Sequence, residues 1–379
     1  MKIRSVWMSF VALMAIMLQS PASANCSLPY TLTNGQTADA SQVMANFNAV
    51  IGCLGTTTGG FVNRFRNGTM DVWQRGTSGT ATTTAGPTTQ TAADGWYVVP
   101  TGASVAWNQV AGRGPTIYSL KVTGASSVTD VLVKQRIESS VAAPLAGQTV
   151  TVQAEVYNST GVSITPTLTV KHAGSADNWS SPVTDVSAVA LQTAANSQWT
   201  QVAYTFSANA ASNNGLEISF DFGNNFGTGS QSIQITELDI RATPGVATGI
   251  NNAPPAPELR PIANELVFCE RYFYQLSANG TAFAAYISAS ANGTIQARGP
   301  LAFPVTMRVA PTAVFSAAST FYFTSGGGNN AANAMGGSFP TPNSVDINMT
   351  LSGSVTSGVG GWIRDANVGT SYMQFSAEL

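Results

Sequence analysis

The sequence predicts a mainly β protein: a short N-terminal helix, an antiparallel jelly-roll β-sandwich, a linker helix and a second, C-terminal β-sandwich. Many short segments alternate apolar and polar residues, and turn-forming residues separate them at regular spacing. Strands do not alternate with long helices, which argues against a parallel α/β sheet. One stretch, Ala253–Gln275, instead carries apolar residues at three-four spacing behind a proline-rich segment, which is typical of a helix.

Composition narrows the class of function. The chain of 379 residues fits two domains and a short extra segment. Only 9% of the residues are charged, against about 25% in typical proteins, and the net charge is −2. Nucleic-acid binding needs clustered Lys and Arg, so this composition argues against it. A surface solvated by Thr, Ser, Asn and Gln suits an extracellular β protein that meets neutral ligands.

We divide the chain into five segments. These are a signal peptide (1–24), an N-terminal helical cap or stem (25–60), a jelly-roll domain (61–243), a proline-rich hinge and helix (244–276), and a C-terminal β domain (277–379).

The first 24 residues have the pattern of a secretory signal. Lys2 and Arg4 supply the positive charge, Val6–Leu18 is the apolar core, and Ala22–Ala24 is a small-residue cleavage site. The apolar run is shorter than the ~20 residues that a membrane span needs. We therefore predict a secreted or extracellular protein without a membrane span.

Export makes the cysteines informative, because oxidising compartments favour disulfides. Cys26 and Cys53 flank one short segment, and a bridge between them would stabilise it by roughly 3 kcal/mol. Cys269 lies in line with the apolar face of the linker helix, where we expect a buried thiol. The alternative is three separate thiols.

The N-terminal stem contains one short helix signal. Asp39 can cap the helix, with Gln42 reaching back from the third position. The apolar residues that follow at three-four spacing are Val43, Phe47, Val50 and Leu54. A helix this short is marginal alone and needs a partner surface.

The first module has eight predicted strands: Ser104–Ala111, Tyr118–Thr123, Val131–Glu138, Thr149–Tyr157, Ser163–His172, Trp199–Phe206, Leu216–Phe222 and Ser232–Arg241. In the last strand the apolar residues change phase, so we expect a bulge near Thr236–Glu237. Three tryptophans beside apolar strand starts are predicted core residues: Trp73, Trp96 and Trp199.

The second module has seven predicted strands: Phe283–Ala289, Thr294–Arg298, Pro311–Ala317, Thr320–Thr324, Val345–Ser352, Gly361–Arg364 and Ser371–Leu379. The Gly- and Asn-rich run Ser325–Gly337 is predicted to be a flexible loop. It is not a phosphate-binding loop, because no Lys-Ser/Thr follows the glycines.

The linker helix is predicted to be apolar on more than one side. One face carries Leu259, Ile262, Leu266, Cys269 and Phe273, and the opposite side carries Val267, Phe268 and Tyr274. At ~1.5 Å per residue the helix would be roughly 25 Å long, and we expect it to join the two β modules.

A polar groove is the predicted ligand site. Alternation places Gln153, Glu155 and Tyr157 on the polar side of one predicted strand. Glu217 and Asp221 lie on the polar side of another predicted strand, whose other side is apolar. Lys171 alternates with the apolar Val170 in a neighbouring segment, and Trp179 lies in the polar loop that follows this segment. If these strands share a sheet, the residues form a groove suited to sugar hydroxyls and to stacking on a sugar ring. An ordinary solvated sheet face is the alternative.

Catalysis has little support in the sequence. The single histidine, His172, has no Gly-x-Ser-x-Gly nucleophile motif beside it and too few potential co-ligands for zinc. Glycoside hydrolysis needs only two carboxylates, for which Glu155, Glu217 and Asp221 are the candidates. We expect no enzyme, and a glycoside hydrolase is the minor alternative.

Several segments carry a resemblance to a known family. Asn63–Gly76 (NRFRNGTMDVWQRG), Ala93–Trp96 (ADGW) and Ile235–Arg241 (ITELDIR) resemble a jelly roll, similar to carbohydrate-binding modules, that is found in phage tail fibres and related bacterial proteins. Pro257–Gln275 (PELRPIANELVFCERYFYQ) and Phe303–Thr312 (FPVTMRVAPT) resemble the C-terminal part of such fibres. Asn34–Val50 is similar to their short N-terminal helical segments.

The resemblance implies a non-enzymatic protein that binds a glycan or a cell-surface polysaccharide. It also implies a structural calcium ion between the opening segment and the closing strand, where Asp71 and Asp239 are the matching carboxylates, and association as a homotrimer. The signal peptide departs from virion proteins and favours a secreted bacterial relative over a virion-associated one. The alternative function is a purely structural phage or prophage fibre component that acts through oligomerisation.

Overall fold

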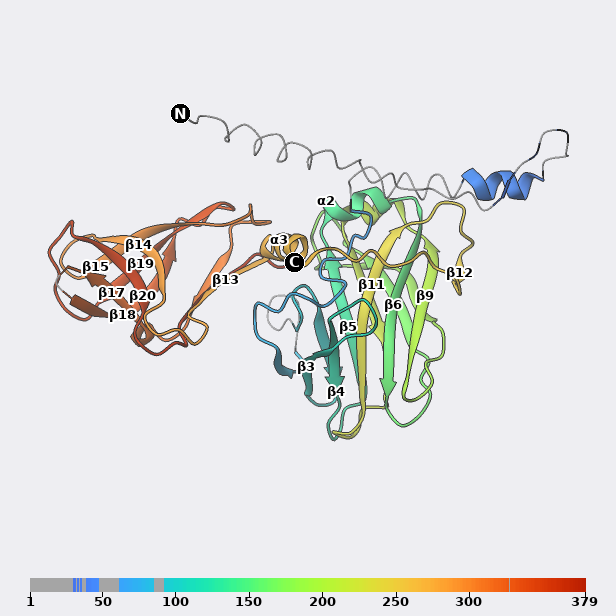
Figure 1. Cartoon of the computed structure of the whole chain (residues 1–379), viewed down its shortest axis with the longest axis horizontal. Helices are drawn as coiled ribbons and strands as arrows, with labels where there is room; N and C mark the ends of the chain where they lie inside the picture. The colour runs from blue at the N-terminus through green and yellow to red at the C-terminus, as the bar shows by residue number, and fades with distance from the viewer. Residues whose placement is uncertain are drawn as a thin grey trace, which may run out of the picture. The chain divides into compact units, whose positions relative to one another are not determined.

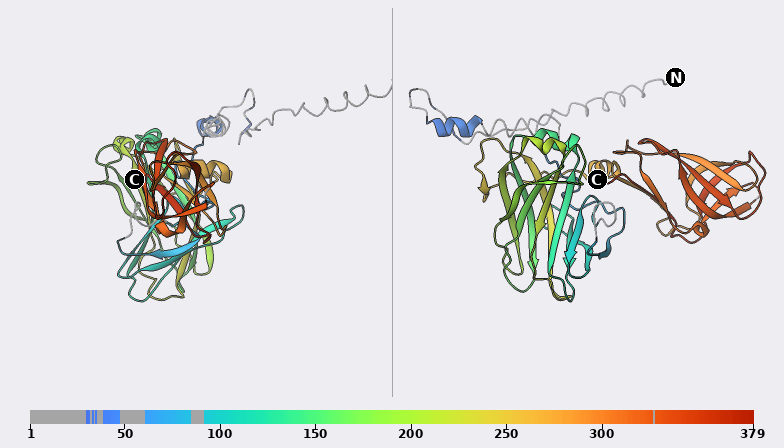
Figure 2. Two further views of the ribbon diagram at one scale, coloured as in Figure 1. Left: turned by 90° about the vertical axis from the view of Figure 1, so that its left-hand side faces the viewer. Right: turned by 180° about the vertical axis from the view of Figure 1, so that it is seen from behind.

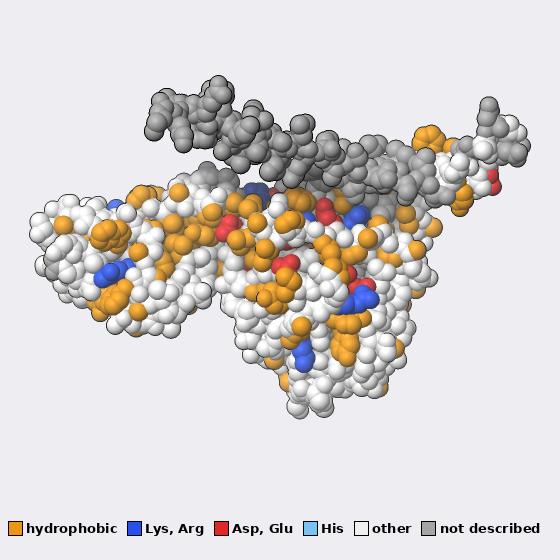
Figure 3. All heavy atoms as spheres, in the orientation of Figure 1, with side chains coloured by type: hydrophobic (Ala, Val, Ile, Leu, Met, Phe, Trp, Pro, Cys, Tyr) orange, Lys and Arg blue, Asp and Glu red, His pale blue; other side chains and the backbone are white. Residues whose placement is uncertain are grey.

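The computed structural model describes residues 30–31, 33, 35, 39–47, 61–84, 92–326 and 328–379. Contacts divide the chain into two units, Met1–Val62 and Asn63–Leu379. The predicted signal peptide and the predicted Cys26–Cys53 bridge lie outside the described residues. Within the described ranges, no helix has the length and apolar character needed to cross a membrane. The face shown in Figure 3 carries few charged side chains among hydrophobic, uncharged polar and backbone atoms.

In the first unit, residues 40–47 are helical. The Asp39 carboxylate accepts a hydrogen bond from the Ser41 N–H at 2.8 Å, which confirms Asp39 as the cap, while the return contact of Gln42 stays a prediction. Met44 and Phe47 lie exposed on this helix. Val50 and Leu54, the later positions of the predicted repeat, are outside the described residues.

The second unit begins with a β-sandwich, and the predicted mainly β class is confirmed. A seven-stranded antiparallel sheet has the order β1-β3-β4-β11-β6-β9-β12, and a five-stranded sheet has the order β2-β5-β10-β7-β8 (Figure 1). The strands are β1 (Ser78–Ala81), β2 (Tyr97–Thr101), β3 (Val105–Ala111), β4 (Tyr118–Thr123), β5 (Asp130–Ile137), β6 (Thr149–Ser159), β7 (Thr167–His172), β8 (Val183–Ala190), β9 (Gln198–Ser207), β10 (Leu216–Asp221), β11 (Ser232–Ala242) and β12 (Gly249–Ile250). Short helical turns cover one end: α2 (Ser139–Ala142), η1 (Ala143–Leu145) and η2 (Ala210–Asn214).

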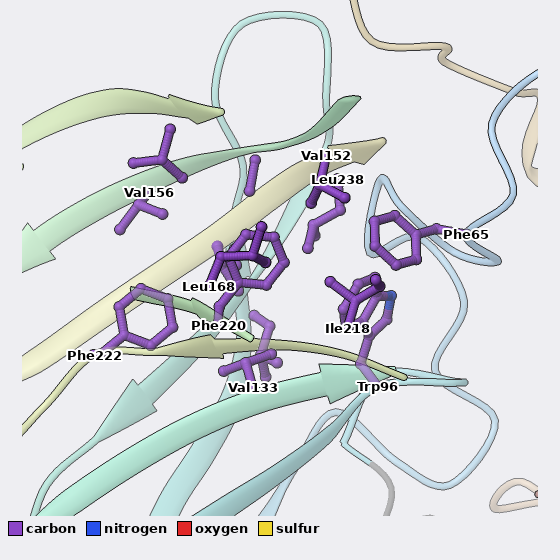
Figure 4. Packing of buried hydrophobic residues seen from close by; sticks show 14 of the residues in the cluster. Phe65, Trp96, Val133, Val152, Val156, Leu168, Ile218, Phe220, Phe222 and Leu238 are labelled. Atoms are coloured by element: carbon purple, nitrogen blue, oxygen red, sulfur yellow. The ribbon is translucent and has the colours of Figure 1, made fainter. Parts of the chain in front are cut away.

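The core of the sandwich follows from the alternation in its strands. Val133 on β5 and Phe220 on β10 point toward Val152 on β6 and Leu238 on β11, so side chains of both sheets meet between the layers (Figure 4). Trp96 is fully buried beside this core, as predicted. Trp73 and Trp199 are only half-buried. Burial of such side chains, at about 25 cal/mol per Å² of apolar surface, supplies most of the driving force for the fold.

The predicted bulge in β11 is confirmed. The register with β6 shifts between Thr236 and Asp239, and Glu237 has φ of 53°. The extra residue returns Leu238 and Ile240 to the core.

Strand β6 is buried on both faces because the linker crosses the outer side of its sheet. The Gln153 side-chain amide donates to the carbonyl of Pro255 at 2.7 Å. The Arg241 guanidinium donates to the carbonyl of Ala256 at 3.1 Å. The linker therefore covers residues that alternation alone places in solvent.

The linker helix is shorter than predicted, and the predicted apolar face is buried only at its end, at Cys269 and Phe273. Helix α3 spans Ile262–Glu270, because the prolines at positions 254, 255, 257 and 261 restrict the preceding chain to extended conformations. After the helix, the chain forms a strand. Leu259, Ile262 and Leu266 are 41%, 57% and 37% exposed, respectively.

The buried side of α3 instead carries Glu265 and Cys269. The Glu265 carboxylate pairs with Arg260 at 2.8 Å and accepts the N–H of Asn67 at 2.7 Å. This ion pair fixes the rotation of the helix against the opening segment of the sandwich. Cys269 is a buried thiol, as expected.

The C-terminal module is a closed barrel with a small sheet, where the sequence predicts a sandwich. The barrel has the strand order β14-β15-β19-β18-β17-β20, and a three-stranded sheet has the order β13-β21-β16 (Figure 2). The elements are β13 (Phe273–Ser277), β14 (Ala285–Ala291), β15 (Gln296–Ala302), β16 (Thr312–Phe315), η3 (Ala318–Thr320), β17 (Phe321–Ser325), β18 (Gly328–Ser338), β19 (Ser344–Leu351), β20 (Gly360–Asp365) and β21 (Tyr372–Ser376). Phe321, Phe323, Ile347 and Ile363 fill the interior.

The predicted flexible loop Ser325–Gly337 is wrong. Most of it forms β18, which pairs with both β17 and β19 and closes the barrel. Its Gly, Asn and Ala residues lack the β-branched pattern of a strand, but small residues allow close contact. A side chain at Gly336 would meet Asn348 at 2.7 Å, and one at Gly337 would meet Val345 at 3.1 Å.

Buried charges tie the sandwich to the residues before and after the barrel. Glu378 pairs with Arg66 at 2.8 Å and with Arg75 at 3.1 Å. The same guanidinium groups lie over the rings of Tyr272 (3.9 Å) and Phe273 (3.5 Å). We call these five residues the junction cluster.

Candidate functional site

The outer side of the five-stranded sheet carries a concentration of polar side chains. The register of β2, β5, β10 and β7 arranges them in rows across the strands. The rows are Arg136, Glu217 and Lys171; Tyr97, Lys134, Ser219 and Thr169; and Leu132, Asp221 and Thr167. We call this set the polar face.

Glu217 lies at the centre of the polar face. Its carboxylate accepts a hydrogen bond from the Tyr97 hydroxyl and another from Arg136 Nε, both at 2.8 Å, and Lys134 Nζ lies 3.8 Å away. Burial alone would raise the pKa of Glu217, but Lys134, Arg136 and Tyr97 together lower it. Burial, and then the nearby carboxylate, raise the pKa of Tyr97 well above its ordinary value. Glu217 therefore stays ionised and orients its neighbours.

Trp179 flanks this network from the loop between β7 and β8. The Arg136 guanidinium lies 4.7 Å from the centroid of its ring. The loop is anchored by Asp177, whose carboxylate accepts the N–H of Ser139 at 2.7 Å. The Trp179 ring is half-buried, and its Nε1 has no hydrogen-bond partner among the described residues. The indole is thus held in place beside the charged row.

Two hydroxyl groups of the polar face also lack partners. Ser219 Oγ and Thr167 Oγ1 are buried and make no hydrogen bond within the described part of the chain. Buried polar atoms without partners are uncommon in folded proteins. In the register of the sheet, Ser219 lies beside Lys134, and Thr167 lies beside Asp221.

A carboxyl pair lies at the edge of the polar face. Burial, and then the adjacent Asp221, raise the pKa of Asp130 to about 6, while Lys134 and the Val131 N–H oppose the shift. This contact therefore disfavours ionisation of Asp130.

The raised pKa of Asp130 predicts a gain in stability as pH falls. Its pKa is about 6 in the folded protein, against an ordinary value of 3.8 when the chain is unfolded, so the folded protein binds this proton more tightly. The free energy of unfolding should therefore rise as pH falls from 7 to 5. Asp130→Asn should flatten this part of the profile. Urea midpoints at both pH values measure the change, and an identical change in wild type and variant would contradict the assignment.

The structure brings together some predicted ligand residues and separates others. Lys171, Glu217 and Asp221 share the polar face, and Trp179 flanks it. The remaining three, Gln153, Glu155 and Tyr157, lie on β6 in the seven-stranded sheet. The premise of a single groove is therefore wrong, because alternation along a strand does not reveal its sheet. Ligand contact by each residue stays a prediction.

The β6 residues have partners of their own. Glu155 pairs with Arg113 at 2.6 Å, and the Tyr157 and Trp199 rings lie 5.5 Å apart. Gln153 bonds to the linker, as described above. These contacts favour a structural role for the side chains on this sheet.

Sequence reasoning missed several members of the polar face. Lys134 and Arg136 alternate with buried residues in β5, and this signal was present in a correctly predicted strand. Tyr97 lies on β2, which contains a proline and was not predicted. Asp130 precedes the predicted start of β5 by one residue.

The predicted calcium ligands do not fit a calcium site as they stand. Both oxygens of Asp239 are bonded to Arg241, and one also accepts the N–H of Glu258 at 2.8 Å. A guanidinium already supplies the cation there. Burial raises the pKa of Asp71, one of whose oxygens has no partner among the described residues. Those residues include no group of three His, Cys, Asp or Glu that could hold a metal ion.

The predicted catalytic carboxylates are poorly spaced for glycoside hydrolysis. Glu217 and Asp221 are four residues apart on β10, which corresponds to roughly 13 Å, whereas hydrolases need about 5–9.5 Å. Glu155 lies on the other sheet. His172 is paired through Nδ1 with Asp185 at 2.8 Å.

Comparison with known proteins gives structural likenesses only. No protein-family model matches the sequence, and no curated protein is similar in sequence. The CBM22-1–GH10 modules of endo-1,4-β-D-xylanase 10B from Clostridium thermocellum, complexed with xylohexaose, are 12% identical over 42% of this chain, with a TM-score of 0.29. The enzymatically active domain of tailspike protein 4 from bacteriophage CBA120 is 11% identical over 48% of this chain, with a TM-score of 0.31.

These matches span 28% of the xylanase chain and 21% of the tailspike chain. A smaller domain is covered almost completely. The CBM22-1 xylan-binding domain from Paenibacillus barcinonensis is 16% identical, with a TM-score of 0.29, and the match spans 44% of this chain and 94% of that domain.

Proposed function

We propose that this protein is a secreted, non-enzymatic binding protein, similar to tail fibres, that recognises carbohydrate through the polar face. The observation that carries the proposal is the row of Arg136, Glu217 and Lys171 beside the half-buried ring of Trp179. Planar charged groups bond to pairs of adjacent hydroxyls, and an indole offers an apolar face to a sugar ring.

The charge balance of the polar face favours an uncharged or weakly charged ligand. Three cations, Lys134, Arg136 and Lys171, lie near three carboxyl groups, Asp130, Glu217 and Asp221. Glu217 neutralises Arg136 directly, so little net field remains to attract a strongly anionic partner. Hydroxyl groups of a neutral glycan can use both kinds of group.

The expected affinity is low for a single site. Each hydrogen bond contributes only about 1 kcal/mol net, so a few contacts give micromolar to millimolar binding. Several copies on one surface would raise the avidity. We therefore expect binding to polysaccharides to exceed binding to short oligosaccharides.

Affinity electrophoresis of the full chain tests the proposal. In gels that contain soluble xylan, galactan or mixed-linkage glucan, at least one polysaccharide should retard the protein relative to a gel without it. Unchanged mobility on a broad panel of neutral polysaccharides would contradict the proposal. Release of reducing ends from a retarding polysaccharide would contradict the non-enzymatic part.

A structural fibre component that acts through oligomerisation is the second candidate. The outward side of α3 favours it, because Ile262, Leu266 and Val267 are exposed at 57%, 37% and 48%, respectively. Packing against copies of the same chain would bury them and stabilise a homotrimer. Light scattering separates the candidates: this role requires a mass near three chains, and glycan binding does not.

A further inference from the structure

A second concentration of aromatic and polar side chains lies on the outer wall of the C-terminal barrel. Trp362 on β20 is 54% exposed, whereas its neighbour Ile363 is fully buried in the barrel. Arg364, two residues along the strand, points to the same outer side as Trp362. The wall therefore presents an indole and a guanidinium whose Cα atoms are about 7 Å apart along one strand.

The neighbouring strands supply the rest of this surface. Across the barrel wall, Trp362 pairs in register with Ser288 on β14 and with Thr324 on β17. Arg364 pairs with Tyr322 on β17. Cross-strand neighbours lie about 5 Å apart, so their side chains form one continuous surface. With Asn329 on β18, we call these six residues the barrel platform.

The guanidinium of Arg364 is held in place without being neutralised. Its Nη2 donates to the side-chain oxygen of Asn329 at 2.9 Å, and that oxygen also accepts from Thr324 at 2.7 Å. The ring of Phe283 lies 4.8 Å away on another side. No carboxylate pairs with Arg364 among the residues that the structure describes, and its buried Nε has no hydrogen-bond partner there.

The other arginine on the barrel wall makes a useful contrast. Arg298 pairs with Asp346 at 2.9 Å, and its guanidinium lies 5.9 Å from the ring of Phe339. Phe339 is 78% exposed, so it is an exposed aromatic beside an arginine whose charge is already balanced. Only the barrel platform combines an exposed indole with an unbalanced cation in the described part of this barrel.

We propose that the barrel platform is a second binding site, specific for a saccharide that carries a carboxylate, such as a uronic acid. The sugar ring stacks on Trp362, while its carboxylate pairs with the guanidinium of Arg364, whose planar N–H groups match a carboxylate. Asn329, Thr324 and Ser288 bond to ring hydroxyls. Both side chains leave the same side of β20 two residues apart, so one acidic sugar can contact both.

Calorimetry on the full chain tests the barrel platform with tetragalacturonate as the acidic probe and a neutral galacto-oligosaccharide for comparison. Wild type should prefer the acidic probe, with affinity that falls as salt rises. Arg364→Gln should weaken binding of the acidic probe at least tenfold and leave neutral binding unchanged, because it removes only the charge-assisted contact. Trp362→Ala should weaken acidic binding to a similar extent.

The matched control is Phe339→Ala, which should bind the acidic probe like wild type. Trp179→Ala distinguishes binding at the barrel platform from binding at the polar face. This variant should bind neutral glycans more weakly and should keep the binding of the acidic probe that depends on Arg364. Failure of wild type to bind tetragalacturonate, or equal binding by Arg364→Gln at unchanged melting temperature, would overturn the proposal. Equal binding of inorganic sulfate, with no effect of Trp362→Ala, would indicate a simple anion site and would also overturn it.

Discussion

Glu378→Ala is expected to lower the free energy of unfolding by about 3–5 kcal/mol. The side chain of Glu378 is 2% exposed and that of Arg66 is 8% exposed, so their ion pair is shielded from water. Removing the carboxylate leaves Arg66 and Arg75 charged and without this partner. A buried charge that loses its partner costs more than the pair itself contributes. Urea unfolding at pH 7 measures the loss.

Asp346→Ala is the matched control for this prediction. It breaks the pair between Asp346 and Arg298, whose side chains are 31% and 33% exposed. Solvent screens that pair, so the expected loss is only about 0–1 kcal/mol. Glu378→Gln should lie between the two, because the amide keeps a hydrogen-bond acceptor and loses the charge. Similar losses for the alanine variants at Glu378 and Asp346 would show that the junction cluster contributes no more than a surface pair.

Eight strands of the sandwich were predictable because apolar and polar residues alternate along them, whereas β1, β2, β8 and β12 were not predicted. Val131, Val133 and Ile137 in β5, like Leu216, Ile218 and Phe220 in β10, alternate with polar residues. Strand β18 has no alternation of large apolar and polar residues, because it consists mainly of Gly, Asn and Ala. These small residues allow close packing against the neighbouring strands. It was therefore mistaken for a loop.

The candidate site was predictable only in part because it depends on which strands become neighbours. Glu217 and Glu155 have the same local pattern, yet β10 and β6 belong to different sheets. No local sequence pattern predicts which part of the sandwich the linker crosses. Alternation predicts solvent exposure for Gln153, but the chain near Pro255 covers it.

The orientation of α3 shows the limit of apolar spacing. Ile262 and Leu266 have the spacing of a buried face, but the helix turns Glu265 inward instead. The Arg260–Glu265 ion pair and the Asn67 N–H determine this orientation. The contact with Asn67 joins residues nearly two hundred positions apart, so no local window of sequence contains it.

Trp179→Ala is expected to weaken glycan binding at least tenfold. The ring is held beside Arg136 by a loop that Asp177 anchors, so a sugar can stack on it without ordering the side chain first. Loss of one such stacking contact, at about 1.5 kcal/mol, corresponds to roughly a tenfold change in affinity. The fold should persist, because Trp179 lies outside the buried core of the sandwich.

Trp199→Ala is the matched control on the opposite sheet. Both tryptophans are half-buried, but Trp199 packs on Tyr157 in the seven-stranded sheet, whereas Trp179 lies beside Arg136. Removal of the Trp199 ring should leave glycan binding unchanged.

The most direct measurement of the central claim is therefore the retardation of both variants, beside wild type, in gels containing a polysaccharide that retards wild type. Both variants should first show melting temperatures high enough to be fully folded in the gel. If the polar face binds the glycan, Trp179→Ala should be retarded far less than wild type, and Trp199→Ala should be retarded like wild type. Retention of binding by Trp179→Ala together with its loss in Trp199→Ala would contradict the account and assign the glycan to the seven-stranded sheet.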